Sequence, residues 1–265
     1  MSNKATIKVV VLYLIIFFIL GSAVGSFLNV VIDRTTRGET IMGRSYCDYC
    51  KAQLGTFDLV PLLSFAVLRA KCRYCKKPLS WQYPIVETIT AILFAVSFWY
   101  LAESGNFDLI TSFYILFLVS TVVVVAVVDW KFSLIPTTFV FAAAIVSLFY
   151  NYFFLSSAVF IENIMAAFGA GLFFLIIVVA TRGRGMGQGD IVLAFLMGIV
   201  LGIRGVLVAV FLAFFLGALF SLILIAIRRK KFGQTVPFAP FLVAGFLIAL
   251  FWGELVLSWY TRALL

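Results

Sequence analysis

The sequence predicts an all-α, polytopic integral membrane protein with about eight transmembrane helices and one small cytoplasmic insert. Three observations lead to this prediction. Hydrophobic residues make up 64% of the 265 residues, charged residues only 12%, and the mean hydropathy is +1.17. Apolar runs of about 20 residues, long enough to cross a bilayer as helices, recur along the chain. The only long polar stretch covers residues 33–82 and holds all four cysteines.

The first apolar run, residues 9–27, lacks a small-residue cleavage site before the next polar stretch. We therefore expect residues 1–32 to hold a retained transmembrane helix and not a cleaved signal peptide. Residues 33–82 would form the insert, and residues 83–265 the membrane core. No internal repeat is evident. The further apolar segments are 83–101, 109–128, 135–154, 160–180, 191–202, 205–227 and 237–257.

Two CxxC pairs dominate the insert, and 21 residues separate the first pair from the second. Paired CxxC knuckles in a basic cytoplasmic loop are typical of a closed four-cysteine zinc site. The reducing cytoplasm disfavours structural disulfides, although redox disulfides and unmetallated thiols remain alternatives. So small a domain has little apolar core, and a metal would supply much of its folding free energy. The expected ligands of a structural Zn²⁺ are Cys47, Cys50, Cys72 and Cys75.

Charge predicts the orientation in the membrane. If the insert is cytoplasmic, 16 of the 20 Lys and Arg residues fall on the cytoplasmic side, including Arg182, Arg184 and the run at 228–231. This is a strong positive-inside signal, although Lys4 and Lys8 oppose it. Basic cytoplasmic loops also explain the formal net charge of +9. We therefore expect membrane lipid, and no nucleic acid, as a partner.

Two aspartates border apolar segments at the same membrane face. Asp129 ends the third segment, VVVVAVVDW, and Asp190 begins the sixth, in the run RGRGMGQGDIVLAF. The predicted topology places both at the cytoplasmic side, so their carboxylates can share one site. Each taken alone has a simpler explanation. Asp190 suits the positive end of a helix dipole, and Asp129 could be an interfacial residue paired with Lys131.

Glycines precede Asp190, and small residues follow it. We expect Gly187 and Gly189 to form a mobile loop that can take positive φ or let another backbone approach closely. Small residues at four-residue spacing allow close helix packing in membranes, and would keep the face bearing Asp190 away from lipid. In the sixth segment they are Ala194, Gly198 and Gly202, and in the seventh Gly205, Ala209, Ala213, Gly217 and Ser221.

The chain contains no histidine, which excludes Ser–His and Cys–His nucleophile systems and His-ligated metal centres. Hydrolysis would need carboxylates, a Ser–Lys pair or a Cys-ligated metal. Two apposed carboxylates cannot both ionise cheaply, so they share a proton. The charged member can take a proton from water while the protonated member polarises a peptide carbonyl, as in aspartic proteases. Asp129 and Asp190 are therefore the predicted catalytic pair.

Several motifs follow one another along the chain. They are GSFLNVVIDR (25–34), two cysteine pairs enclosing DLVPLLSF (58–65), YPIVE (83–87), the Asp129 segment followed by LIP (134–136), GQGD (187–190) and VPFAPFL (236–242). Together they resemble the bacterial type IV prepilin leader peptidase/N-methyltransferase family of GxGD-type membrane aspartic peptidases. GxGD alone is weakly specific, but the ordered set is highly specific and extends from about residue 21 to the C-terminus.

The resemblance implies an enzyme that cuts a short basic leader from type IV prepilins or pseudopilins at the cytoplasmic side of the bacterial inner membrane. It also implies N-methylation of the new N-terminal residue with S-adenosylmethionine. The family's two catalytic aspartates correspond to Asp129 and Asp190. Its methyltransferase function is associated with the cytoplasmic insert, and the lysine of its Leu-Arg-Gly-Lys-Cys stretch corresponds to Lys71.

Three positions depart from the family pattern. Ala70 stands before Lys71 where the family often has glycine, which bears on methyl transfer more than on cleavage. Thr137 follows LIP where the family usually has Asp or Asn, so support for Asp129 is expected to be weaker. Gln188 replaces the more usual bulky residue of GxGD, which we expect to matter little.

Other classes of function stay open. A proton-coupled transporter would use Asp129 and Asp190 as a relay, but it predicts aspartates near the bilayer centre and broken helices in paired halves. A membrane-anchored zinc scaffold or redox protein would depend on the four cysteines. Within the family, the alternative is a peptidase that has lost methyl transfer.

Overall fold

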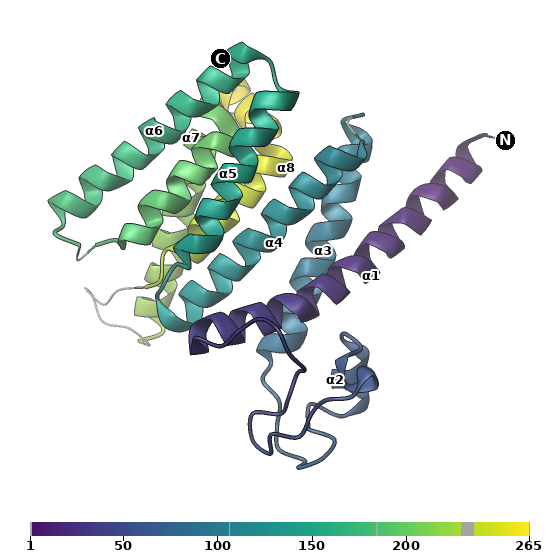
Figure 1. The fold of residues 1–265 in the computed structure, drawn as a ribbon. Helices are drawn as coiled ribbons and strands as arrows, with labels where there is room; N and C mark the ends of the chain where they lie inside the picture. Colours follow the sequence, from purple (N-terminus) through teal and green to yellow (C-terminus); the bar gives the residue numbers. More distant parts are fainter. Residues whose placement is uncertain (1, 106, 184, 229–235, 265) are drawn as a thin grey trace. The chain divides into compact units, whose positions relative to one another are not determined.

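The computed structural model describes residues 2–105, 107–183, 185–228 and 236–264, and over these residues it contains helices and no strands (Figure 1). The prediction of an all-α fold is therefore confirmed. Arg184 and residues 229–231, counted above among the cytoplasmic charges, lie outside the described residues. The chain divides into two compact units, Met1–Val124 and Val125–Leu265.

Two helices form the framework of the first unit. Helix α1 (Ser2–Arg37) packs along α3 (Gln82–Glu103), and two glycines of α1 permit the close approach. A Cβ atom on Gly21 would lie 2.7 Å from the Cα atom of Ala91, and one on Gly25 would lie 2.8 Å from the Cα atom of Glu87. Gly25 is the first residue of the motif GSFLNVVIDR. This close contact explains why the motif begins with a glycine. Helix α1 continues ten residues beyond the predicted segment, as far as Arg37.

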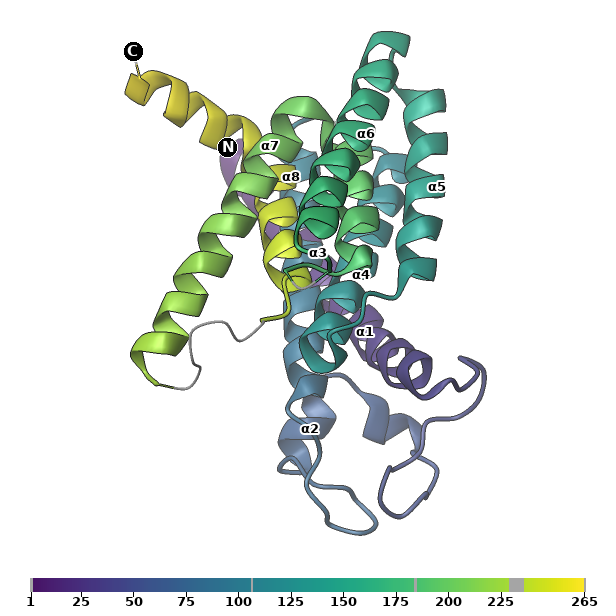
Figure 2. The same ribbon diagram turned by 90° about the vertical axis from the view of Figure 1, so that its left-hand side faces the viewer.

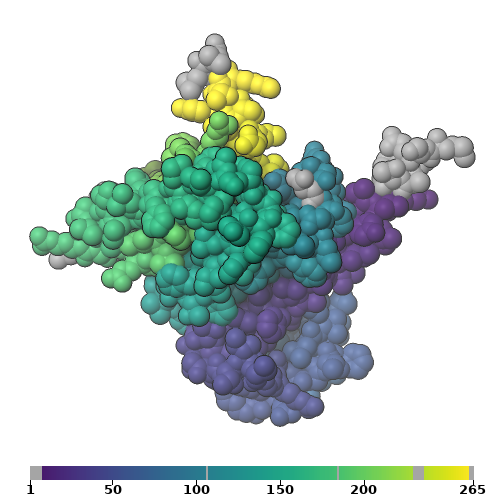
Figure 3. All heavy atoms as spheres, turned by 45° about the horizontal axis from the view of Figure 1, so that its top comes forward, coloured from purple at the N-terminus to yellow at the C-terminus, as the bar shows by residue number. Residues whose placement is uncertain are grey.

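The insert contains two short helices, η1 (Thr56–Leu59) and α2 (Leu63–Val67), and it forms a purple-to-blue lobe with the end of α1 (Figure 3). Its two cysteine pairs have the same backbone hydrogen bonds at an offset of 25 residues. These are Cys47 N–H to Ala52 O and Lys51 N–H to Cys47 O in the first knuckle, and Cys72 N–H to Lys77 O and Lys76 N–H to Cys72 O in the second.

The expectation of no internal repeat is therefore wrong. The stretches SYCDYCKAQL (45–54) and AKCRYCKKPL (70–79) share five identical positions and one backbone geometry. A repeat this short escapes notice beside apolar segments of twice its length. It makes the insert a pair of equivalent knuckles joined by residues 55–69.

The second unit consists of helices. Helix α4 (Leu109–Phe132) begins in the first unit and enters the second at Val125. It is followed by α5 (Thr137–Phe154), α6 (Ser157–Ala180), α7 (Gln188–Ala226) and α8 (Ala239–Leu264). Over the described residues of the whole chain, seven helices are long and apolar enough to cross a membrane.

Helix α7 accounts for the difference between eight predicted segments and seven helices, because it contains both the sixth and the seventh segment. Its 39 residues would span about 58 Å if straight, whereas the hydrocarbon core is about 30 Å thick. At Gly202 the backbone leaves helical geometry with φ 66° and ψ −174°. Beyond this break the second half of α7 runs back in the opposite direction (Figure 2). Buried Asn151 of α5 donates to the Ile199 carbonyl beside the break, at 2.7 Å.

The stripes of small residues on α7 are packing surfaces, as predicted. A Cβ atom on Gly198 would collide with the backbone of Ala167 in α6. In the second half, Ala209 and Ala213 have no exposed surface, and Gly245 of α8 packs directly against the Ala209 carbonyl. These contacts hold α6, α7 and α8 together and turn the start of α7 toward protein.

Candidate active site

Asp129 and Asp190 lie at helix ends and are both buried in the second unit. Asp129 stands in the last turn of α4 and is 6% exposed, and Asp190 stands in the first turn of α7 and is 4% exposed. The start of α7 packs against the connection that follows α4, because a Cβ atom on Gly189 would lie 2.6 Å from the Cβ atom of Ile135. The two aspartates therefore stand at neighbouring helix ends.

The Asp129 carboxylate is held by the start of α8. Its Oδ2 atom accepts a hydrogen bond from the backbone N–H of Ala239, the first residue of α8, at 3.1 Å. The positive end of the α8 dipole therefore faces a carboxylate. Our sequence reasoning missed this donor. Its only signal was Pro240 in the motif VPFAPFL, since proline favours the first turn of a helix.

The Asp190 carboxylate caps its own helix. Its Oδ2 atom accepts a hydrogen bond from the backbone N–H of Gly187 at 2.9 Å, which is half of a capping box with Gly187 at the N-cap. The simpler explanation for Asp190, a helix-start residue favoured by the dipole, is thus correct for its position. It does not exclude a second role, because the hydrogen bond to Gly187 uses only the Oδ2 atom of the carboxylate.

The two glycines of GQGD have different surroundings. Gly187 has φ −82°, and Gly189 lies inside α7, so the expected positive φ is found at neither. Close approach is found at Gly189, where a Cβ atom would lie 2.6 Å from the Cβ atom of Ile135 in the motif LIP. Gly189 therefore lets the connection between α4 and α5 pack against the start of α7. The side chain of Gln188 is exposed, which explains why the protein tolerates an unusual residue there.

The four cysteines form one cluster whose sulfur atoms all lie within 4.8 Å of one another. The Sγ atoms of Cys47 and Cys75 are 3.8 Å apart. Tetrahedral zinc with Zn–S bonds of about 2.3 Å requires sulfur atoms about 3.8 Å apart, whereas a disulfide requires about 2.0 Å. All four thiols are free of disulfides. The number, type and spacing of these donors fit structural Zn²⁺.

The thiols are unequal when no metal is bound. Backbone hydrogen bonding from Cys75, together with that from Tyr74, lowers the pKa of Cys72 to about 7. Although the backbone N–H of Lys77 favours the thiolate of Cys75, burial and the neighbouring thiols raise its pKa to about 11. Four crowded thiols cannot all ionise on their own, and a divalent cation favours the thiolate form of each.

Lys71 and Ala70 lie at the start of the second knuckle. The side chain of Lys71 is exposed, and its backbone pairs with Pro78. Ala70 has φ 57°, in the left-handed region that favours glycine. Alanine at this position, where the family often has glycine, therefore strains the backbone locally.

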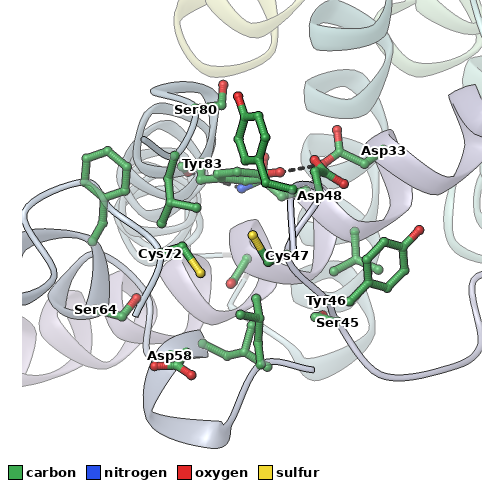
Figure 4. Close-up of a pocket in the computed structure, with 18 of the residues that line it drawn as sticks. Asp33, Ser45, Tyr46, Cys47, Asp48, Asp58, Ser64, Cys72, Ser80 and Tyr83 are labelled. Atoms are coloured by element: carbon green, nitrogen blue, oxygen red, sulfur yellow. Dashed lines mark hydrogen bonds between the residues drawn. The ribbon is translucent and has the colours of Figure 1, made fainter. Parts of the chain in front are cut away.

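A cavity of about 420 Å³ lies within the first unit, between the end of α1, the insert and the start of α3 (Figure 4). Asp33, Tyr83 and Glu87 line it, together with Cys47 and Cys72 of the cysteine cluster. Lys71 is not among its lining residues. The motifs GSFLNVVIDR and YPIVE supply parts of this wall, but the spacing between them does not indicate a shared cavity.

Comparison with protein families matches both units. Residues 19–101 match the bacterial peptidase A24 N-terminal domain, and residues 116–222 match the type IV leader peptidase family. A protein of Bacillus subtilis named prepilin leader peptidase/N-methyltransferase is 31% identical, covering 93% of this chain and 97% of its own. Proteins of the same name from Legionella pneumophila and Pseudomonas aeruginosa are 29% and 26% identical, over 90% and 92% of this chain and 91% and 92% of their own. No solved structure shows a significant match.

Proposed function

The chain belongs to the type IV leader peptidase family, and from this membership we propose a membrane aspartic endopeptidase that removes the basic leader of prepilins or pseudopilins. We further propose that it N-methylates the new N-terminal residue. The names of its relatives, prepilin leader peptidase/N-methyltransferase, support both activities. Residues 83–265 would carry the peptidase, and residues 33–82 the methyltransferase.

One observation carries the peptidase mechanism: two buried carboxylates stand at neighbouring helix ends, and each accepts a hydrogen bond from a backbone N–H. The charged member of the pair takes a proton from a water molecule, whose oxygen attacks the carbonyl carbon of the scissile bond. The protonated member donates a hydrogen bond to the carbonyl oxygen. Proton transfer to the leaving nitrogen then accompanies cleavage of the C–N bond and regenerates the pair. The hydrogen bonds from Ala239 and Gly187 would hold the two carboxylates in place.

The position of the aspartates along their helices favours cleavage near a membrane face. Asp129 is three residues from the end of α4, and Asp190 is the third residue of α7. A transporter relay would need such groups near the middle of its helices. The basic loops favour a cytoplasmic position for this face, at the inner membrane of a bacterial cell. There the enzyme would meet the basic leader while the apolar helix of the substrate stays in lipid.

Methyl transfer would follow cleavage. The nitrogen of the new α-amine forms a bond to the methyl carbon of S-adenosylmethionine while the carbon–sulfur bond breaks. A proton leaves the nitrogen, and the donor leaves as a neutral thioether. Bound Zn²⁺ would cross-link the two knuckles through Cys47, Cys50, Cys72 and Cys75, and would supply folding free energy to the insert.

A mass measurement tests both activities together. Membranes containing the protein are incubated with a prepilin-type substrate and isotopically labelled S-adenosylmethionine. Loss of the leader plus one labelled methyl group is the expected result. Loss of the leader alone would contradict the methyltransferase, and an unchanged mass would contradict the whole proposal.

A further inference from the structure

The cavity of the first unit has the size and the walls of a small-molecule site. Its volume of about 420 Å³ falls within the usual range of roughly 300–1,000 Å³ for such sites. Part of its lining is aromatic or aliphatic, including Tyr46, Leu54, Phe65 and Leu68. Such a wall suits the flat purine of a nucleoside, while the remaining wall is polar.

Carboxylates outnumber guanidinium groups in the lining, by five to three. Two of the guanidinium groups form ion pairs, Arg37 with Asp48 at 2.7 Å and Arg73 with Asp58 at 2.6 Å. The third, that of Arg34, donates to four backbone carbonyls of the loop that follows α1. The cavity is thus acidic within a chain of net charge +9. An acidic site with walls of low dielectric attracts a cationic ligand.

Asp33 is held in the cavity wall by two side chains at the start of α3, those of Gln82 and Tyr83. Its Oδ2 atom accepts a hydrogen bond from the Tyr83 hydroxyl at 3.0 Å (Figure 4). Asn29 donates to the Tyr83 carbonyl at 3.1 Å and accepts from the Gln82 amide at 3.1 Å, so the end of α1 is fastened to the start of α3 around this pair. Polar groups locked in this way bind a ligand with little loss of side-chain entropy.

Glu87 lines the same cavity but has a structural role. Its Oε2 atom accepts a hydrogen bond from the backbone N–H of Leu62 at 2.8 Å. Leu62 has φ 61°, a left-handed conformation that this hydrogen bond helps to hold. Glu87 is therefore a positioning residue, which attaches the insert to α3 and closes one side of the cavity.

From these features we propose that the cavity binds the methyl donor, S-adenosylmethionine, with its purine against aromatic and aliphatic side chains and its positive charge toward Asp33. The donor combines a nucleoside with a sulfonium and an ammonium group, which matches a cavity lined by both apolar and acidic side chains. This inference rests on the methyltransferase activity proposed above and gives that activity a place and a recognition residue.

Binding to the full-length protein in detergent micelles tests the proposal. The probes are S-adenosylmethionine and 5′-methylthioadenosine, a neutral nucleoside thioether that lacks the sulfonium and the amino acid. In Asp33→Asn the affinity for S-adenosylmethionine should fall by roughly tenfold or more, with little change for the neutral probe. Tyr83→Phe keeps the Asp33 carboxylate but removes the hydroxyl that donates a hydrogen bond to it. This variant should lower the ratio of the affinity for S-adenosylmethionine to that for 5′-methylthioadenosine, but by less than Asp33→Asn does. Glu103→Gln removes a charge at the other end of α3 and should leave the ratio unchanged.

The same proteins are tested for cleavage and methylation. In Asp33→Asn the ratio of the methylation rate to the cleavage rate should fall at least tenfold relative to the wild-type protein. An unchanged affinity ratio in both Asp33→Asn and Tyr83→Phe, with wild-type protein that binds the donor and methylates, overturns the cavity assignment alone. Wild-type protein that cleaves but neither binds the donor nor methylates overturns the proposed methyltransferase and the cavity assignment together. If Asp33→Asn is poorly folded by thermal melting, Tyr83→Phe decides the outcome.

Discussion

The carboxylate of Asp129 accepts a hydrogen bond from the first backbone N–H of α8, that of Ala239, 3.1 Å away. Asp190 is held in a similar way by the N–H of Gly187. Both aspartates are thus fixed by main-chain donors, which neither titrate nor change with sequence. The pair can pass through different protonation states while the groups that orient it stay the same.

Replacing either aspartate by asparagine should abolish leader cleavage. In Asp129→Asn or Asp190→Asn the amide cannot take a proton from water, and we expect a loss of roughly a thousandfold or more in cleavage rate. Cleavage of a prepilin-type substrate in membranes measures this. The control is Asp108→Asn, because Asp108 caps the other end of α4 through the N–H groups of Ile110 and Thr111. Near-normal cleavage by either dyad variant contradicts the mechanism.

The two glycines of GQGD should differ in their tolerance of a methyl group. Gly189→Ala places a Cβ atom 2.6 Å from that of Ile135, whereas at Gly187 the nearest neighbour is the Asp190 carboxylate at 3.6 Å. We expect Gly189→Ala to displace the start of α7 and to reduce cleavage by roughly tenfold or more. Gly187→Ala should retain most activity. Gly169→Ala in α6, where the added methyl meets nothing within 4 Å, is the packing control. Equal loss in both GQGD variants would show that conformational freedom matters more than space.

Removal of the metal should impair the insert more than the peptidase core. Chelation or Cys72→Ser should lower the metal content and the melting temperature, and should impair methylation more than cleavage, because Cys47 and Cys72 line the cavity. Tyr74→Phe, which changes an exposed residue of the same knuckle, is the control. Metal content, melting temperature and both activities are measured on the same samples. An unchanged melting temperature in metal-free protein would contradict a structural metal, and full methylation would contradict the dependence of the cavity on it.

Metal affinity should also depend on pH. Zinc binds thiolates, and without metal the pKa of Cys72 is about 7 and that of Cys75 about 11. Protonation of Cys75 therefore competes with zinc over the whole range tested, and protonation of Cys72 adds to it below about pH 7, so zinc affinity should fall more steeply there. A chelator competition series between pH 8 and pH 5 measures the trend. An affinity that does not change over this range would contradict a thiolate site.

Glycine at position 70 should stabilise the insert. Ala70 has φ 57°, and an L-residue in this region carries a strain of about 1 kcal/mol, partly offset by the greater flexibility of glycine in the unfolded chain. Ala70→Gly should therefore raise the free energy of unfolding by up to about 1 kcal/mol and slow zinc loss to a chelator. Ala66→Gly, inside helix α2, should instead lower it by about 1 kcal/mol. Destabilisation by both variants would show that Ala70 is not strained.

The helices could be predicted because they depend on hydropathy, which the sequence displays directly. Basic residues indicate the side of each loop, and this alone is enough to predict one face for Asp129 and Asp190. The partner of Asp129 could not be predicted, because every residue except proline has a backbone N–H, and Pro240 indicates only that a helix starts near Ala239, not which side chain it faces. The division of α7 into two apolar segments is correct, but hydropathy does not reveal that Gly202 alone makes the turn.

The cavity shows a different limit of sequence reasoning. Asp33 and Tyr83 are 50 residues apart, and each belongs to a motif with its own packing role. Only the packing of α1 along α3, set by Gly21 and Gly25, brings the two side chains together. That contact depends on which helix faces which, and hydropathy carries no information about it.

Helix α1 is unbroken from Ser2 to Arg37, a length of about 54 Å, whereas a bilayer core needs only about 30 Å. Its last turns, which bear Asn29 and Asp33, therefore continue a helix that is long and apolar enough to cross a membrane, and they form part of the cavity wall. No flexible linker separates this part of the wall from the apolar part of α1. A single-residue deletion within α1 would shift Asn29 and Asp33 by about 1.5 Å along the helix axis and rotate them by about 100°. The geometry of the cavity thus depends on the length of a helix most of which lies far from it.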